Sequence, residues 1–207
     1  MIDVEVSEET TDRLHAILAG IENAEEKVLK PALARGLSAG KTAFSKQTRE
    51  TYHVSPSILS SYSKVGYKNV SVSGNGIIGS IEYSGGVIPL FKFNVAPKKP
   101  TYGKKAVKAS VMRSGGQVVF ENAFIAQMKS GHLGIFEGKG TWRRSTRPTK
   151  TGGNTENNEK IKELFGPSVP RMAENAVVLQ SVEDRVNEVI NQRIDHEIER
   201  ILSGNGG

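Results

Sequence analysis

Five aliphatic residues recur at every fourth position near the C-terminus, and this repeat constrains the fold more than any other feature. The repeat consists of Val182, Val186, Ile190, Ile194 and Ile198. Apolar side chains at this spacing are typical of an amphipathic helix that buries one face. We therefore predict a long C-terminal helix with Ser181 as its N-cap, followed by a flexible tail over residues 203–207.

Helical spacing also marks the N-terminal quarter of the chain, after a predicted N-terminal extension over residues 1–9. Apolar residues between positions 10 and 29 predict a first helix. Pro31 predicts the start of a second helix that runs to about Thr51, since proline is favoured in a first helical turn. That helix is rich in alanine and glycine, which predicts close packing against a neighbouring element. Ser55 and Pro56 predict the cap and first turn of a short third helix.

The periodicity changes to alternation after residue 62. Two runs flanking Gly74-Asn75-Gly76 predict a β-hairpin. Further strands are predicted at residues 87–93, 106–112, 117–120, 124–128 and 133–136, with the last two forming a second hairpin. The polar segment 138–159 predicts an exposed basic loop. We therefore predict a single α+β domain over residues 1–207, with N-terminal helices, a central antiparallel β-sheet with hairpins and long loops, and a long C-terminal helix.

Charge is distributed unevenly along the chain. Residues 1–26 have a net charge of −7, residues 27–155 of +17 and residues 156–207 of −4, within a total of +6. A basic middle between acidic ends indicates a polyanionic partner or charge-complementary subunits. The alternative is a solvated basic face without a dedicated partner.

Two acid-free stretches contain the candidate contact residues. In the first, between Tyr83 and Phe120, the candidate contacts for partner proteins are Lys98, Lys99, Lys104 and Lys105. In the second, around Trp142, the candidates for contact with DNA in a channel or with a subunit are Lys139, Arg143, Arg144, Arg147 and Lys150. Such side chains neutralise phosphates without reading sequence, and tryptophan stacks on bases. The alternative is a solvated loop against an acidic neighbouring subunit.

No residue pattern in the sequence indicates catalysis. There is no cysteine, no two of the four histidines have the helical spacing of a metal site, and the Gly40-Lys41-Thr42 sequence lacks the spacing of a phosphate-binding loop. No run of about 18 apolar residues predicts a membrane span. We predict a protein without enzymatic activity, cofactor, metal or membrane contact, folded in a reducing cytoplasm.

Two motifs resemble a known family. The run Ile-Lys-Glu-Leu-Phe-Gly-Pro-Ser-Val-Pro-Arg-Met at 161–172 and the segment Ala-Phe-Ile-Ala-Gln-Met-Lys-Ser-Gly-His at 123–132 are similar to phage minor tail protein Z and related tail-component proteins. The return strand of that family's hairpin falls on residues 134–137. Apart from the resemblance, Gly166, Pro167 and Pro170 predict a rigid corner between sheet and helix, because glycine accepts positive φ and proline fixes φ.

The resemblance implies a tail completion protein of the virion, assembled in the host cytoplasm. Such proteins form a ring, here expected to be a hexamer, at the head-proximal end of the tail. They contact other tail and neck proteins and help to join the tail to the head, while genomic DNA passes through the channel. Two alternatives stay open, namely a different head–tail joining protein and a sequence-nonspecific nucleic-acid-binding protein.

Overall fold

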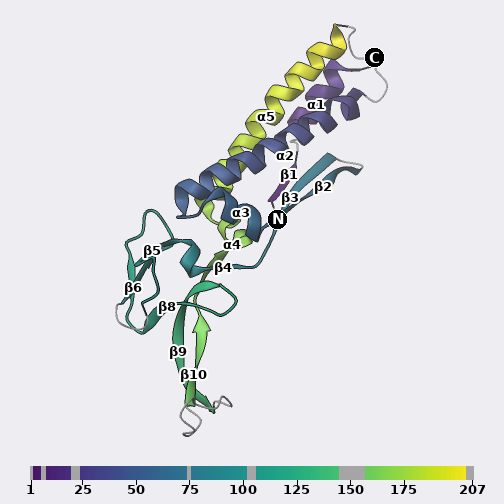
Figure 1. Ribbon diagram of the computed structural model, residues 1–207. Helices are drawn as coiled ribbons and strands as arrows, with labels where there is room; N and C mark the ends of the chain where they lie inside the picture. Colours follow the sequence, from purple (N-terminus) through teal and green to yellow (C-terminus); the bar gives the residue numbers. More distant parts are fainter. Residues whose placement is uncertain are drawn as a thin grey trace. The chain divides into compact units, whose positions relative to one another are not determined.

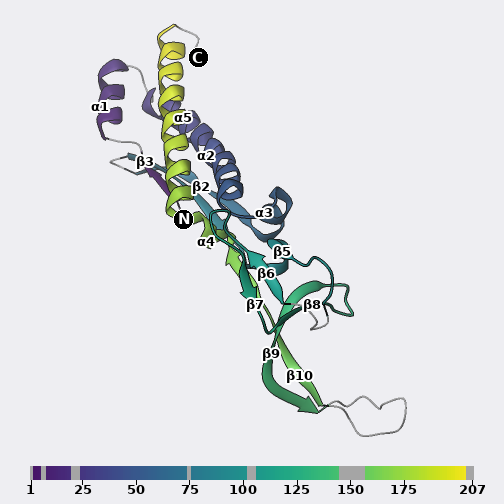
Figure 2. The same cartoon turned by 90° about the vertical axis from the view of Figure 1, so that its left-hand side faces the viewer.

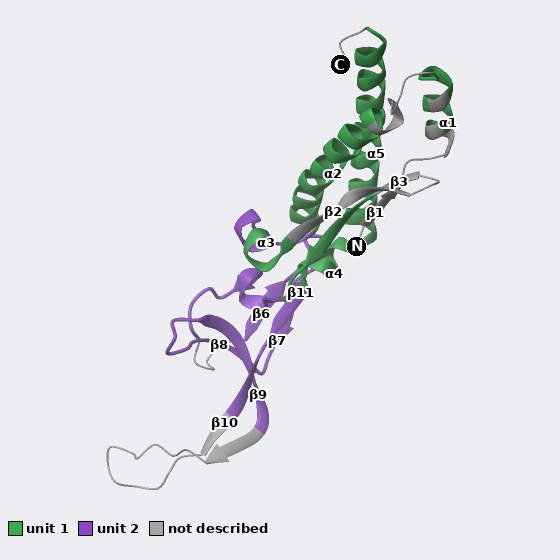
Figure 3. Ribbon diagram, turned by 90° about the vertical axis from the view of Figure 1, so that its right-hand side faces the viewer, with its two compact units in different colours: residues 1–51, 59–86, 168–207 green, residues 52–58, 87–167 purple. Residues whose placement is uncertain are grey.

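A computed structural model gives the arrangement of helices and antiparallel strands (Figure 1). It describes residues 2–5, 8–19, 24–73, 76–101, 106–144 and 157–203. The α+β class with N-terminal helices and a long C-terminal helix is confirmed. The chain forms two compact units, coloured separately in Figure 3: unit 1 contains residues 1–51, 59–86 and 168–207, and unit 2 contains residues 52–58 and 87–167. The single domain expected from the sequence stays a prediction.

Unit 1 combines two long helices with a three-stranded antiparallel sheet (Figures 1 and 2). Its elements are β1 (Ile2–Glu5), α1 (Glu8–Ile17), α2 (Ala24–Thr51), most of α3 (Pro56–Tyr62), β2 (Lys64–Ser73), β3 (Gly76–Ser84), α4 (Val169–Ala173) and α5 (Ala176–Leu202). The sheet order is β1-β3-β2, and α2 packs both on α5 and on β3. The predicted hairpin after residue 62 is therefore confirmed as β2 and β3.

Glycines on α2 allow the close approach to α5. A Cβ atom at Gly36 would lie 2.5 Å from Cγ1 of Ile190. A Cβ atom at Gly40 would lie 2.6 Å from Cγ2 of Val186 and 2.9 Å from Cδ1 of Ile81 on β3. Real side chains do not approach this closely, so the predicted close packing of the small-residue helix is confirmed.

The C-terminal helix begins earlier than the sequence indicated. All five residues of the four-residue repeat are buried, as predicted. The predicted cap is wrong, because Ser181 lies inside α5 and the cap is Asn175, whose side chain accepts a 3.1 Å hydrogen bond from the Val177 N–H. Val178 is fully buried and extends the apolar face one turn toward the N-terminus. Ser203 ends the helix, and the remainder of the predicted tail, 204–207, lies outside the described residues.

The boundary between the first two helices was also placed wrongly. Helix α1 ends at Ile17, and α2 already begins at Ala24, so that Pro31 lies inside α2. A proline inside a helix removes one backbone hydrogen bond and costs about 3 kcal/mol. Four neighbours are fully or almost fully buried, namely Val28, Leu29, Ala32 and Leu33. Burial of each larger aliphatic side chain contributes about 1.5–3 kcal/mol, which offsets this cost.

The predicted N-terminal extension also contains regular structure. Residues 2–5 form β1, which pairs antiparallel with β3 in a register that places Ile2 opposite Ile81 and Glu5 opposite Ile78. Residues 8 and 9 are the first residues of α1. Backbone pairing with β3 therefore fixes a segment whose short alternating pattern was not enough to predict a strand.

Unit 2 consists of short antiparallel sheets. Its elements are β4 (Val87–Pro89), η1 (Leu90–Lys92), β5 (Asn94–Ala96), β6 (Val107–Ser110), β7 (Val118–Phe120), β8 (Ala123–Gln127), β9 (Leu133–Arg144), β10 (Asn157–Glu163) and β11 (Phe165–Ser168), of which the last residue belongs to unit 1. The strand orders are β5-β6-β7, β10-β9-β8 and β11-β4. The predicted second hairpin is confirmed as β8 and β9. The strand predicted over 87–93 is too long, because a 3₁₀ turn follows Pro89.

The segment with Gly166, Pro167 and Pro170 joins strand β11 to helix α4, but not through the positive φ expected at Gly166. Gly166 is part of the extended strand and does not have a positive φ. Its lack of a side chain matters because a Cβ atom would lie 2.5 Å from Cε2 of the buried Phe93. Helix α4 then starts at a serine cap, with the Ser168 Oγ accepting a 3.3 Å hydrogen bond from the Arg171 N–H and Pro170 in the first turn.

We predict that Gly166→Ala destabilises the protein by about 1–3 kcal/mol, the usual cost of overpacking a filled core. The added methyl group must displace the Phe93 ring, which is itself buried. Chemical denaturation followed by circular dichroism measures the loss. The double variant Gly166→Ala with Phe93→Leu should recover part of it, and equal stability of Gly166→Ala and wild type would contradict the described contact.

Candidate functional site: the basic arm of unit 2

Strands β9 and β10 form a long antiparallel hairpin in unit 2. Strand β8 pairs with β9 only from Leu133 to Glu137. Beyond Glu137, β9 pairs with β10 alone among the described residues, from Gly138 opposite Ile161 to Arg144 opposite Asn157. We call this two-stranded part, residues 138–144 and 157–161, the basic arm. Within the described part of unit 2, no third strand pairs with the arm.

A bulge interrupts the pairing within the basic arm. Gly138 lies opposite Ile161 and Trp142 lies opposite Glu159, so β9 has three residues between these pairs where β10 has one. Gly140, in this interval, has a φ of 64°. Left-handed backbone costs other residues roughly 1–2 kcal/mol, which explains glycine at this position. Bulges of this kind increase the local twist and change the direction of a hairpin.

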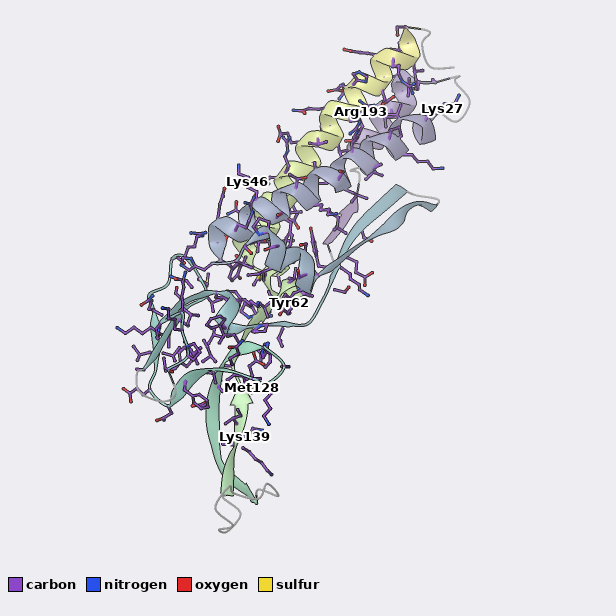
Figure 4. All side chains as sticks on the ribbon, viewed as in Figure 1. Lys27, Lys46, Tyr62, Met128, Lys139 and Arg193 are labelled. Carbon is purple, nitrogen blue, oxygen red and sulfur yellow. The ribbon has the colours of Figure 1, made fainter. Side chains whose placement is uncertain are left out.

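The structure corrects the predicted loop over residues 138–159. Residues 138–144 and 157–159 are strand, and residues 145–156 lie outside the described part of the chain. Lys139 is exposed on β9, as Figure 4 shows. Arg143 and Arg144 are the last two residues of β9, directly opposite β10. The predicted contacts Arg147 and Lys150 lie outside the described residues.

Two basic residues of this hairpin were missed by the sequence analysis. Lys160 and Lys162 are exposed on β10, and Lys160 occupies the bulge opposite the Lys139 region of β9. They fall outside the acid-free stretch, since Glu156, Glu159 and Glu163 surround them. The pairing of residues 138–144 with 157–163 brings both lysines into the same hairpin as Lys139. The polar sequence between the two strands contains no pattern that predicts this pairing.

The base of the hairpin is joined by a side-chain contact from distant positions in the sequence. Nε2 of His132 lies 2.7 Å from Oε1 of Glu163, and the His132 ring meets Phe136 edge-on at 6.4 Å. Gly134 leaves room for this carboxylate, since a Cβ atom there would lie 2.7 Å from the same oxygen. The contact connects the β8–β9 turn to β10 and thereby supports the hairpin where the arm begins.

The second predicted set of basic residues lies between β5 and β6 of unit 2. Lys98 and Lys99 are exposed, and Lys104 and Lys105 lie outside the described residues. The structure thus places Lys98 and Lys99 in the segment that joins two strands of the β5-β6-β7 sheet. It does not bring them into the hairpin with Lys139.

The two units differ sharply in charge. Unit 1 contains 13 Lys and Arg against 17 Asp and Glu, a net charge of −4. Unit 2 contains 15 Lys and Arg against 5 Asp and Glu, a net charge of +10. The basic middle of the sequence is therefore divided: of the 21 Lys and Arg in residues 27–155, 13 belong to unit 2 and eight to unit 1, where they are outnumbered by acids.

The part of the chain that the structure describes holds no group of three or more metal-ligating side chains. None of the helices described there is long and apolar enough to cross a membrane. Comparison of the chain with protein-family models, with curated proteins and with solved structures finds no match. The basic arm is therefore the feature on which a function can be argued.

Proposed function

We propose that this chain is a non-enzymatic structural protein of a tailed phage particle, a tail completion protein that assembles as a ring at the head-proximal end of the tail. The observation that carries the proposal is the basic arm, a two-stranded part of a unit with net charge +10. A ring of such units concentrates positive charge around a channel through which DNA passes. Lysine and arginine neutralise phosphates without base readout, as a channel for any genome sequence requires.

The resemblance to phage tail-component proteins supports the proposal through two structural elements. Its hairpin motif coincides with β8 and the start of β9, the part of the sheet from which the arm extends. Its Gly-Pro-Ser-Val-Pro motif coincides with the passage from β11 to α4. The motifs therefore belong to segments that build the hairpin and connect it to unit 1.

A sequence-nonspecific nucleic-acid-binding protein is the second candidate, and the same arm favours it. The two functions differ in the number of copies that act together. A ring protein is found in purified particles and binds DNA weakly as a single chain. A monomer that binds duplex DNA tightly, with no copies in the particle, supports the second candidate instead.

Reversing the charge of Arg143 and Arg144 at the end of the arm, together with Arg147 outside the described residues, tests the proposal. We predict that the variant with all three residues changed to Glu folds like the wild type, which circular dichroism measures. The variant should impair particle assembly or DNA retention, measured as the fraction of DNA-filled infectious particles. In vitro, loss of three phosphate contacts should lower the slope of log affinity against log salt by about three.

A matched control makes the same charge change in unit 1. Lys27, Lys41 and Lys46 are exposed on α2, and changing all three to Glu should leave infectivity near the wild-type level. Normal infectivity of the arm variant would show that the arm does not face DNA. Absence of the chain from purified particles, tested by mass spectrometry, would overturn the proposed function itself.

A further inference from the structure

Strand β7 presents apolar side chains on both faces of a sheet edge. It is the outer strand of the β5-β6-β7 sheet, and its register places Val119 opposite Lys108 and Val118 opposite Ala109. Val119 therefore shares the exposed face with Lys108. Val118 shares the inner face with Ala109, yet Val118 is 59% exposed where Ala109 is 3% exposed. The inner face of β7 thus extends past the core that covers its neighbour β6.

Among the usual protections of a free edge, this strand has its short length of three residues. Proteins also protect free edges with charged residues, proline, bulges or a covering segment, because an open edge accepts another chain. Strand β7 has the sequence Val-Val-Phe, and no strand pairs with its outer edge among the described residues. Met112 adds further exposed apolar surface in the preceding loop. These features describe a surface that a partner covers.

Unit 1 presents a surface of complementary chemistry. An open groove of about 620 Å³ lies along one face of the N-terminal half of α5 beside Gln47 of α2. Its lining includes Val177, which is 60% exposed, the exposed carboxylates Asp184 and Glu188, and Arg185, whose Nη1 lies 2.7 Å from Oε2 of Glu188. Because Arg185 offsets the charge of Glu188, the groove offers the Asp184 carboxylate beside an uncovered apolar side chain, whereas the β7 edge combines uncovered apolar side chains with Lys108.

We propose that copies of this chain associate head to tail, with the β7 edge of one copy docked in the α2–α5 groove of a second copy. Val119 covers Val177, and Lys108, which lies on the same face of the sheet as Val119, faces Asp184. Charge supports a second copy as the occupant, because unit 2 has a net charge of +10 and unit 1 of −4. Two different surfaces on each chain make a heterologous contact, which closes into a ring when the rotation permits. The inference rests on the proposed ring and deepens it by naming its contact.

Complementary charge reversals test this geometry. Lys108→Glu and Asp184→Lys each replace an exposed side chain, and within the chain the Asp184 carboxylate accepts a 2.9 Å hydrogen bond from Gln180. Each variant alone places like charges together, so the dissociation constant for self-association should rise by on the order of tenfold or more. The chain that carries both changes should recover association, because the pair is then reversed on every copy. Native mass spectrometry and sedimentation velocity of the purified full chain measure these outcomes.

Mixing the two single variants adds a test that is specific to a head-to-tail contact. The edge of the Lys108→Glu variant is acidic and fits the groove of the Asp184→Lys variant, which is basic. The edge of the Asp184→Lys variant and the groove of the Lys108→Glu variant keep their wild-type charges and also attract each other. An equal mixture should therefore associate more strongly than either variant alone, beginning with mixed dimers. As controls, Lys92→Glu in unit 2 and Glu199→Lys on α5, both at exposed positions, should leave association unchanged.

Three results would overturn the inference. The wild-type chain could stay monomeric at all accessible concentrations, or the single variants could associate as strongly as wild type. The third result is a double variant that associates no more strongly than the single variants. These outcomes are separate from the fate of the proposed function. If the chain is monomeric but is found in phage particles, the proposed contact is wrong and the proposed function stands. If the chain self-associates in a charge-dependent way but is absent from particles, the contact stands and the proposed function is wrong.

Discussion

Ile194→Ala is expected to lower the free energy of unfolding by about 2–5 kcal/mol, the range for large-to-small changes in a filled core. Ile194 is 2% exposed and belongs to the row of α5 residues that packs within unit 1. Alanine removes its apolar contacts and leaves a cavity that the surrounding helices fill only partly. Urea denaturation followed by circular dichroism measures the change.

The same helix provides a matched control for this substitution. Leu202, at the end of α5, is 60% exposed, and Leu202→Ala should change the unfolding free energy by within about 0.5 kcal/mol. Equal midpoints for Ile194→Ala and wild type would mean that the apolar row faces water. That result would contradict the packing of α5 described for unit 1.

Gly40→Ala is the second substitution with a large expected effect. Alanine favours the helix over glycine by about 1 kcal/mol, so an exposed site would gain stability from this change. At Gly40 the added methyl group collides with Val186 and Ile81, which lie 2.6 Å and 2.9 Å from its position. We expect the steric clash to outweigh the gain in helix propensity, with a net loss of about 1–3 kcal/mol in the free energy of unfolding. The reason is that both contacts are buried side chains from different elements.

Ser38→Ala on the exposed side of α2 controls for helix propensity. Serine is a weaker helix former than alanine, so this substitution should be neutral or slightly stabilising. A stability gain at Gly40→Ala similar to that at Ser38→Ala would show that α2 and α5 are farther apart than the contact requires. Val186→Ala combined with Gly40→Ala should relieve part of the clash.

Elements with a strong local pattern were predictable. The C-terminal repeat was visible because burial of one helix face requires the same spacing that the sequence contains, and all five residues are buried. The β2–β3 hairpin followed from alternation around a glycine-rich turn. In both cases the signal lies within a few turns or residues of chain, so no distant contact was needed to interpret it.

Tertiary contacts decided the features that were predicted wrongly. Pro31 is tolerated inside α2 because buried neighbours stabilise the helix on both sides of it. Gly166 is required by the Phe93 ring, which lies far away in the sequence and whose proximity no local rule indicates. The arm depends on pairing β9 with β10 across a bulge, and the His132–Glu163 contact depends on that pairing. The basic composition of the region was visible, but its geometry was not.

The pairing of α2 with α5 has a consequence for synthesis on the ribosome. Chains emerge from the N-terminus, and domains generally fold as they become complete. All of unit 2 lies between the two helices in the sequence, so it can fold while the side of α2 at Gly36 and Gly40, which Ile190 and Val186 of α5 cover, still lacks its partner. A nascent chain halted near residue 175 would therefore expose that side of α2 to chaperones and aggregation, and release of α5 would be the step that protects it.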